Sequence, residues 1–483
     1  MKVRTAVLLL AAVIANLNSN AQARPHVDAS VHRALRQHGS VNLMITMKES
    51  NRRALESVSV NTFASRGAKI EHLVETLEAH ATTSHGDVIK VLSQESVSEQ
   101  PLFARYEMFW ISNQVYIEAA SFELVEKLVQ LPSIDEVREE EVAELEDFSS
   151  TSGSSSRNVG GGDAGGSVEW GVEQIGAPQL WAKGFTGQGV VVGSIDSGVR
   201  VTHEALAGNF IGDHGWYAPP NNLTEPSDKS GHGTHTMGTI AGSGGIGVAP
   251  GAKWMSCRGC PSGLCIESYL LTCFQFMVCP TDTNGLNRDC SKAPHIINNS
   301  WTTERGRTVF SAAVETWLSV GIIPVFASGN TGPECGTTQP PGDHPRILSV
   351  GSTTVNGSLA YTSGKGPAFD SGIVKPDLSA PGHSVRSAAH KDDAGYATKS
   401  GTSMASPHVA GAIALLLSAR PGLGIDEIRS LLMTTADQKS LAPTNMSCGD
   451  TSESTWPNNN YGYGRINVLD AYKKLVASSS ASR

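Results

Sequence analysis

"GVVVGSID", residues 189–196, is an apolar run rich in valine that ends in an aspartate. Such a continuous run is typical of a strand buried on both faces of a parallel sheet. Similar runs occur in "HIINNSW" (295–301), "GIIPVFASGN" (321–330) and "RILSVGST" (346–353), and helix-like segments lie among them in "GTHTMGTIAGS" (233–243), "GRTVFSAAVETWLSVG" (306–321) and "SMASPHVAGAIALLLSAR" (403–420). Strands that alternate with helices predict an α/β fold for residues 167–476, a doubly wound parallel sheet with helices on both faces.

Residues 24–147 have a different pattern. Strand-like segments are "VNLMITM" (41–47), the two halves of "ARYEMFWISNQVYIEAA" (104–120) and the start of "IDEVREEEVAELE" (134–146), while "AKIEHLVETLEAH" (68–80) and "SFELVEKLVQL" (121–131) have helical spacing. The order β-α-β-β-α-β predicts a small α+β, ferredoxin-like domain. The acidic run 135–147 is read as a solvated face, or as a complement to an exposed part of the larger domain.

Residues 1–23 have the features of a signal peptide: a basic start, the apolar run "AVLLLAAVIA" and the small-x-small sequence "AQA". The apolar run is shorter than the roughly 20 residues that span a membrane. We therefore expect cleavage after about Ala23 and secretion to the extracellular space, with an uncleaved anchor as the alternative. Residues 148–166 are rich in serine and glycine, which predicts a flexible linker open to proteolysis, and residues 477–483 are expected to form a short tail.

The chain of 483 residues carries a formal net charge of −9, which argues against a nucleic-acid partner. Its eight cysteines all follow residue 256, and six of them fall within 257–290. An even count in an exported chain favours disulfides, although eight cysteines allow 105 pairings. "CRGC" (257–260) is weighed as a zinc or redox motif, but no second CxxC or HxxxH pair accompanies it.

Three residues form a candidate catalytic set. Ser403 lies at the start of an apolar helix, where it is either an N-cap or a nucleophile beside the positive end of the helix dipole. His232, flanked by glycines, offers a general base, and Asp196, at the end of the first buried strand, offers the carboxylate that orients it. Asn330, just after a strand and a glycine, is placed to donate to a developing oxyanion together with the Ser403 N–H.

The order Asp, His, Ser is the subtilisin order. The chain resembles subtilisin-family serine proteases (subtilases) in "GSIDSGV" (193–199), "GHGTHTMGT" (231–239), "GVAPGA" (247–252), "SGN" (328–330), "KPDLSAPG" (375–382) and "SGTSMASPHVAG" (400–411), and "INNSW" is most like the bacillopeptidase F branch. The resemblance implies Ser403 as nucleophile, His232 as general base and acid, Asp196 as orienting carboxylate and Asn330 as oxyanion donor. It also implies that Ser300, Trp301 and Gly329 bind substrate.

The resemblance extends to processing and partners. Residues 40–147 resemble the inhibitory propeptide that precedes such domains, which implies a zymogen that cleaves itself in the linker. Expected partners are protein or peptide substrates and the chain's own propeptide, with no membrane partner and a monomeric state. No cofactor is expected for catalysis. Structural calcium is common in the resembled family, but no D-x-[DN]-x-[DN]-G loop occurs in this sequence.

Two other functions are weighed. Asp196-Ser197-Gly198 and Asp370-Ser371-Gly372 would suit an aspartic protease, whose two carboxylates share a proton. That hypothesis leaves His232, Asn330 and Ser403 unexplained. A peptide-binding pseudoprotease is the second alternative, and it is disfavoured because all four catalytic residues are present. His235 and His408 are interpreted as structural histidines.

Overall fold

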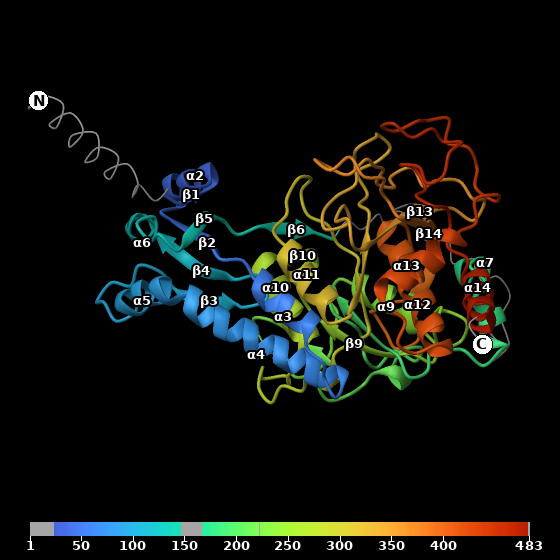
Figure 1. The fold of residues 1–483 in the computed structure, drawn as a ribbon, viewed down its shortest axis with the longest axis horizontal. Helices are drawn as coiled ribbons and strands as arrows, with labels where there is room; N and C mark the ends of the chain where they lie inside the picture. Colours follow the sequence, from blue (N-terminus) through green and yellow to red (C-terminus); the bar gives the residue numbers. More distant parts are fainter. Residues whose placement is uncertain (1–23, 146–166, 222, 482–483) are drawn as a thin grey trace, which may run out of the picture. The chain divides into compact units, whose positions relative to one another are not determined.

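The computed structural model describes residues 24–145, 167–221 and 223–481. These residues form two compact units, shown in Figure 1. The first unit comprises the chain up to Arg52 and Leu77–Glu140, and the second unit comprises Arg53–Thr76 and the chain from Glu141 onward. The expected signal peptide (1–23) and linker (148–166) lie outside the described residues.

The first unit is built on a five-stranded sheet with the order β1-β5-β2-β4-β3. The strands are β1 (His26–Val27), β2 (Ser40–Met47), β3 (Arg105–Phe109), β4 (Gln114–Ser121) and β5 (Ile134–Glu139), and the helices α2 (Ala29–His38), α5 (Gly86–Glu95) and α6 (Phe122–Leu128) accompany them. The pairs β2–β4, β2–β5 and β3–β4 are antiparallel, and the short β1 adds in parallel to β5. The expected β-α-β-β-α-β order is confirmed in β2, the helices after it, β3, β4, α6 and β5.

The second unit contains a seven-stranded, all-parallel sheet with the order β14-β13-β12-β11-β7-β9-β8. Its strands are β7 (Val191–Ile195), β8 (Trp216–Tyr217), β9 (Lys253–Cys257), β11 (Ile296–Asn299), β12 (Ile323–Ala327), β13 (Leu348–Thr353) and β14 (Leu378–Pro381). Within the sheet, β8 and β9 lie on one side of β7, whereas β11, β12, β13 and β14 lie on its other side. The carboxyl ends of β7 and β11 therefore form the switch point at which α/β sheets place ligand sites.

Helices cover both faces of this sheet, as expected. Alternate strand residues such as Val192, Ile296 and Val325 pack in one apolar core with α7 (Trp170–Gln174), α8 (Ala177–Trp181), α9 (His232–Ala241), α12 (Thr402–Ala419), α13 (Ile425–Thr434) and α14 (Val468–Ala481). The strand residues between these point to the opposite face of the sheet. Gly193 lies so close to Met277 of α10 (Glu267–Val278) that a Cβ would come within 2.7 Å of its sulfur. α11 (Ser311–Ser319) belongs to this second face, because its Trp317 stacks on Phe274 of α10.

Two small antiparallel pairs complete the second unit. β15 (Val385–Ala388) pairs with β16 (Tyr396–Lys399), and β6 (Val142–Glu144) pairs with β10 (Leu264–Ile266). Short 3₁₀ turns occur at Ala207–Asn209, Pro261–Gly263 and Cys290–Lys292. Among the described residues, α12 alone has the length and hydropathy of a membrane-spanning helix, and 89% of that window is buried, so it is a core helix.

The compact units divide the chain differently from the expected boundary at residue 147. The helix α3 (Arg52–Val60) and the start of α4 (Arg66–Ser84) belong with the second unit. Arg66 explains part of this, because its guanidinium donates to the carbonyls of Ala293 (2.7 Å) and Pro294 (2.5 Å). At the other end, α14 continues to Ala481, past the expected start of the tail at residue 477.

All eight cysteines are paired, as expected for an oxidising compartment. The disulfides are Cys257–Cys273, Cys260–Cys265, Cys279–Cys290 and Cys335–Cys448. The two cysteines of "CRGC" therefore have different partners, which removes the zinc and redox hypotheses for that motif. The cluster Glu71, Cys279 and Cys290 has the spacing of a metal site, but its two sulfurs are bonded to each other and are not thiolate ligands.

Candidate active site

Asp196 is the residue that directly follows β7, and its carboxylate is fully buried. Its Oδ1 accepts hydrogen bonds from the Ser197 N–H and from His232 Nδ1, both at 2.7 Å, and its Oδ2 accepts from Thr236 Oγ1 at 3.2 Å. A buried charge requires such donors. Because a carboxylate only accepts, the proton of the short bond belongs to His232 Nδ1, which leaves Nε2 as the basic nitrogen of the neutral ring.

The glycines around His232 are needed for close approach. Gly231 caps α9 with a φ of 81°, and a Cβ there would lie 2.0 Å from His390 Nδ1. A Cβ on Gly233 would lie 2.1 Å from the carbonyl oxygen of Gly198. Both positions therefore exclude a side chain, and at Gly233 this lets the first turn of α9 lie directly against the loop that carries Asp196.

Asp228 holds this first turn in place. Its Oδ1 accepts from Ser197 Oγ (2.9 Å) and from the backbone N–H groups of Ser230 (3.0 Å) and Gly231 (2.8 Å). Its Oδ2 accepts from the N–H (2.9 Å) and the hydroxyl (2.7 Å) of Thr234. Asp228 thus caps the helix that begins at His232 and also fixes the residue next to Asp196.

Ser403 is the second residue of α12, and its neighbour is Ser300, which follows β11. The Ser403 hydroxyl donates to the Ser300 carbonyl at 3.1 Å, and the Ser300 hydroxyl donates to the Ser403 carbonyl at 2.9 Å. Pro407 explains the second bond, because it has no N–H to offer the carbonyl four residues earlier. Ser300 therefore fastens the start of α12 to the carboxyl end of β11.

Asn330 follows β12 and faces the same helix start. Its Oδ1 accepts from the N–H (2.8 Å) and the hydroxyl (3.0 Å) of Thr402, the residue before Ser403. These two donors fix the orientation of the amide, so that Nδ2 is the group able to donate toward a ligand. At a helix start the Ser403 N–H is also among the groups without an intrahelical acceptor. Two N–H donors suited to an oxyanion thus come from neighbouring positions.

Gly329 lies beside Gln339, a residue that the sequence analysis did not single out. A Cβ on Gly329 would lie 2.4 Å from Gln339 Oε1. The Gln339 amide also accepts from Thr302 Oγ1 (3.3 Å) and donates to the Thr303 carbonyl (3.4 Å). Gln339 therefore joins the segment after Trp301 to the segment that carries Asn330.

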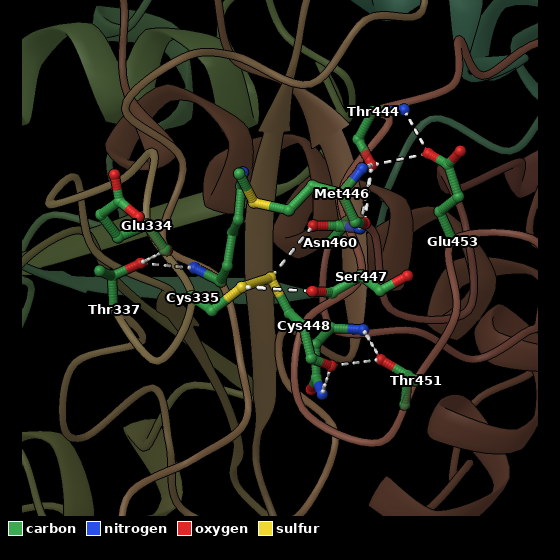
Figure 2. Close-up of a disulfide and its surroundings, with 12 residues drawn as sticks. Glu334, Cys335, Thr337, Thr444, Met446, Ser447, Cys448, Thr451, Glu453 and Asn460 are labelled. Atoms are coloured by element: carbon green, nitrogen blue, oxygen red, sulfur yellow. Dashed lines mark hydrogen bonds between the residues drawn. A yellow bond between two sulfur atoms is a disulfide. The ribbon is translucent and has the colours of Figure 1, made fainter.

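The loop after Asn330 is anchored by the disulfide between Cys335 and Cys448 (Figure 2). The segment around Cys448 is itself well tied. Asn460 Nδ2 donates to Thr444 Oγ1 (3.0 Å) and to the Met446 carbonyl (2.8 Å), as Figure 2 shows. The disulfide thus links the loop that follows Asn330 to a segment held by side-chain hydrogen bonds.

Trp301 does not offer its side chain to a ligand. The indole is 2% exposed and packs edge-on against Phe274, Phe310 and Phe326. Any contact of Trp301 with an extended peptide therefore involves its backbone. The substrate-binding roles expected for Ser300, Trp301 and Gly329 stay predictions.

Strand addition is seen at another edge, which the sequence analysis missed. β6 pairs with β10 in antiparallel fashion, Val142 opposite Ile266 and Glu144 opposite Leu264. The Leu145 N–H continues the ladder to the Gly263 carbonyl at 2.9 Å. β10 has Cys265 at its centre and is only three residues long, so neither alternation nor length marks it as a strand in the sequence.

The two other histidines of the quoted motifs, His235 and His408, are buried and bonded to backbone carbonyls. His235 Nε2 donates to the carbonyls of Val385 (3.0 Å) and Ala397 (3.1 Å), and burial lowers its pKa to about 3. His408 Nδ1 donates to the Met404 carbonyl (2.9 Å), and burial lowers its pKa to about 4. Both imidazoles are therefore neutral structural groups at physiological pH.

The two Asp-Ser-Gly triplets do not form a carboxylate dyad. Asp196 is buried in bonds to His232, Ser197 and Thr236, whereas Asp370 is an exposed loop residue. Asp370 lines a separate cavity of about 170 Å³ with Asp343 and Phe369. This arrangement rules out the aspartic-protease hypothesis, which needs one proton shared between two adjacent carboxylates.

Comparison with known proteins gives consistent matches. The Subtilase family matches residues 187–464, more than half of the chain. Bacillopeptidase F of Bacillus subtilis is 32% identical over 84% of this chain and 28% of its own length, and subtilisin J of Geobacillus stearothermophilus is 30% identical over 82% and 91%. The crystal structure of fervidolysin from Fervidobacterium pennivorans has the same fold, with a TM-score of 0.62 at 19% identity, covering 93% of this chain and 63% of that one. The chain thus spans less than a third of bacillopeptidase F.

Proposed function

Since the chain belongs to the subtilase family, we propose that it is a secreted serine endopeptidase made as a self-processing zymogen. The observation that carries the proposal is the buried 2.7 Å bond from His232 Nδ1 to Asp196 Oδ1. This bond lies at the start of α9, which packs against α12, the helix that carries Ser403. It fixes the tautomer and orientation that a histidine base needs.

The chemistry follows from the residues. Ser403 Oγ gives its proton to His232 Nε2 and attacks the carbonyl carbon of a peptide bond. Asp196 stabilises the resulting imidazolium, and His232 then passes the proton to the leaving amine. Asn330 Nδ2 and the Ser403 N–H donate to the oxyanion that forms on the carbonyl oxygen. The acyl group on Ser403 is released by water, which His232 activates in the same way.

The zymogen proposal assigns residues 24–147 as the inhibitory propeptide and residues 148–166 as the processing segment. It is supported by the β6–β10 ladder, in which a segment leading into the linker pairs with β10 as an added strand. An extended substrate would bind by the same kind of strand addition. Residues 1–23 would direct secretion. A monomer, protein substrates and no catalytic cofactor are part of this proposal, and a structural calcium ion is compatible with it.

The experiment uses the full-length chain in a host that lacks other exported proteases. The wild type should hydrolyse casein and accumulate as a species that begins within residues 148–166. Ser403→Ala should accumulate as one chain from about residue 24 and leave casein intact. Ser418→Ala, the same change at the far end of α12, is the matched control and should behave as the wild type.

Two results would count against the proposal. Casein hydrolysis by Ser403→Ala would remove that serine from the reaction. Trimming of Ser403→Ala at the wild-type site would show that another protease processes the chain.

A further inference from the structure

We infer that the β10 edge carries a subsite for an acidic side chain, formed by Arg307, and that this subsite favours peptides with glutamate or aspartate on the N-terminal side of the cleaved bond. The inference rests on the proposed endopeptidase function and specifies its substrate class. It starts from the acidic run 135–147, for which the catalytic residues give no role.

One glutamate of that run has a defined partner in the second unit. Glu141 Oε1 lies 2.5 Å from Arg307 Nε, and the Glu141 side chain is only 13% exposed. Arg307 lies in the loop between Trp301 and α11, and its own side chain is 38% exposed. The pair is therefore partly withdrawn from solvent, where a charge contact is stronger than at an open surface.

The backbone at Glu141 is held by different groups. Its N–H donates to Glu267 Oε2 at 2.9 Å, and its carbonyl accepts from the Glu267 N–H at 3.0 Å. From there the β6–β10 ladder runs to Leu145. Backbone bonds of this kind accept any sequence, so they give affinity without selectivity. The ion pair between Arg307 and the Glu141 side chain is, by contrast, a contact that depends on the residue type.

The two residues after Glu141 limit which peptide side chains the second unit can select. Val142 is 56% exposed and points away from the second unit's interior, while Ala143 is 8% exposed opposite Cys265. Successive side chains of a strand face opposite sides, so Glu141 and Ala143 share the face turned toward the protein. The structure thus assigns one charged contact and one small-residue contact to a peptide on this edge.

The test compares three internally quenched peptides on the processed wild-type enzyme. The first carries the chain's own residues 138–158, the second carries Glu141→Gln and the third carries Val142→Thr. We expect kcat/KM for the first and third to agree within twofold. We expect the second to be about tenfold lower, an effect between that of an exposed ion pair and that of a buried charged hydrogen bond.

Enzyme variants locate the effect. Arg307→Gln should cleave the first two peptides at equal rates, by slowing only the glutamate peptide. Arg307→Lys should retain part of the preference. Arg305→Gln removes the same charge from the same loop, where the guanidinium lies 4.7 Å from the Phe369 ring centre, and should keep the full preference.

Each other outcome has a clear meaning. Equal cleavage of all three peptides by the wild type would overturn the inference while leaving the endopeptidase function intact. An unchanged preference in Arg307→Gln, or an equal loss of rate on both peptides, would also overturn it, because Arg307 would then act elsewhere. Failure of the wild type to cleave any peptide would instead refute the proposed function.

Discussion

Replacing Asp228 by alanine should damage both the stability of the second unit and the alignment of the proposed catalytic pair. The carboxylate accepts five hydrogen bonds, three of them from backbone N–H groups at the start of α9. Loss of a helix cap costs about 1–2 kcal/mol. A donor left without an acceptor costs about 1–3 kcal/mol when water cannot replace it.

Asp228 is only half-buried, so water would satisfy some of the donors that the change exposes. We therefore expect a total loss of about 3 kcal/mol in the free energy of unfolding. Each kcal/mol lowers Tm by about 2–4 °C in a domain of moderate size, which gives a fall of about 6–12 °C. Asp228→Asn keeps one acceptor oxygen and should lose about half as much.

The kinetic effect follows from Ser197 and Gly231. Asp228 bonds to both, and they are the immediate neighbours of Asp196 and His232 in the chain. A displacement of about 1 Å at a catalytic group can lower the rate about 10²-fold. We expect kcat to fall 10- to 100-fold, by the same argument, with KM changed much less.

The assay measures Tm in an inactive Ser403→Ala background, where self-digestion cannot occur, and kcat and KM in the active chain. Asp213→Ala is the matched control, because its carboxylate is 77% exposed and pairs only with His214 among the described ion pairs. A decrease in Tm of less than 2 °C, together with a kcat within twofold of the wild type, would refute the role assigned to Asp228.

Other predictions concern the proposed oxyanion donor, the buried histidines and the long-range disulfide. Asn330→Ala should lower kcat by about 10²–10³ with little change in KM, because the amide meets charge that exists only in the transition state; a loss confined to KM would contradict this. Burial lowers the pKa of His235 to about 3 and that of His408 to about 4. Between pH 6.5 and pH 5, therefore, these histidines bind protons only in the unfolded chain. Each should lower the free energy of unfolding by about 2 kcal/mol between pH 7 and pH 5. If Tm is the same at pH 7 and pH 5, both in the wild type and in His408→Gln, the predicted loss of stability on acidification is refuted. Replacing Cys335 and Cys448 by serine opens a loop of sequence separation 113 and should lower stability by at most about 5 kcal/mol; an unchanged Tm would show that the bridge adds nothing.

The sequence predicts the main sheet and the Asp196–His232 contact for local reasons. The valine-rich run before Asp196 predicts a buried parallel strand, and parallel strands bring their carboxyl ends to one edge. The glycines beside His232 indicate close backbone approach, and the structure shows why no side chain fits there. Pro407 predicts a missing helix bond, but the group that replaces it, Ser300 Oγ, comes from the residue that follows β11.

Features that depend on distant contacts could not be predicted in this way. The pairing of Cys335 with Cys448 is set by tertiary structure, and the sequence alone leaves every pairing open. Asp228 resembles an ordinary turn residue until its five donors are seen together. The strand β10 and its partner β6 are each three residues long, which is too short for a periodic pattern.

Covalent labelling of the proposed nucleophile tests the central proposal most directly. A serine-directed phosphonylating reagent is added to the wild type, and the adduct is located by mass spectrometry of its peptides. The account predicts one adduct on Ser403, with activity lost in proportion, and no adduct in His232→Ala because the hydroxyl then lacks its base. Labelling of a different residue with loss of activity, or full labelling of Ser403 in His232→Ala, would contradict it.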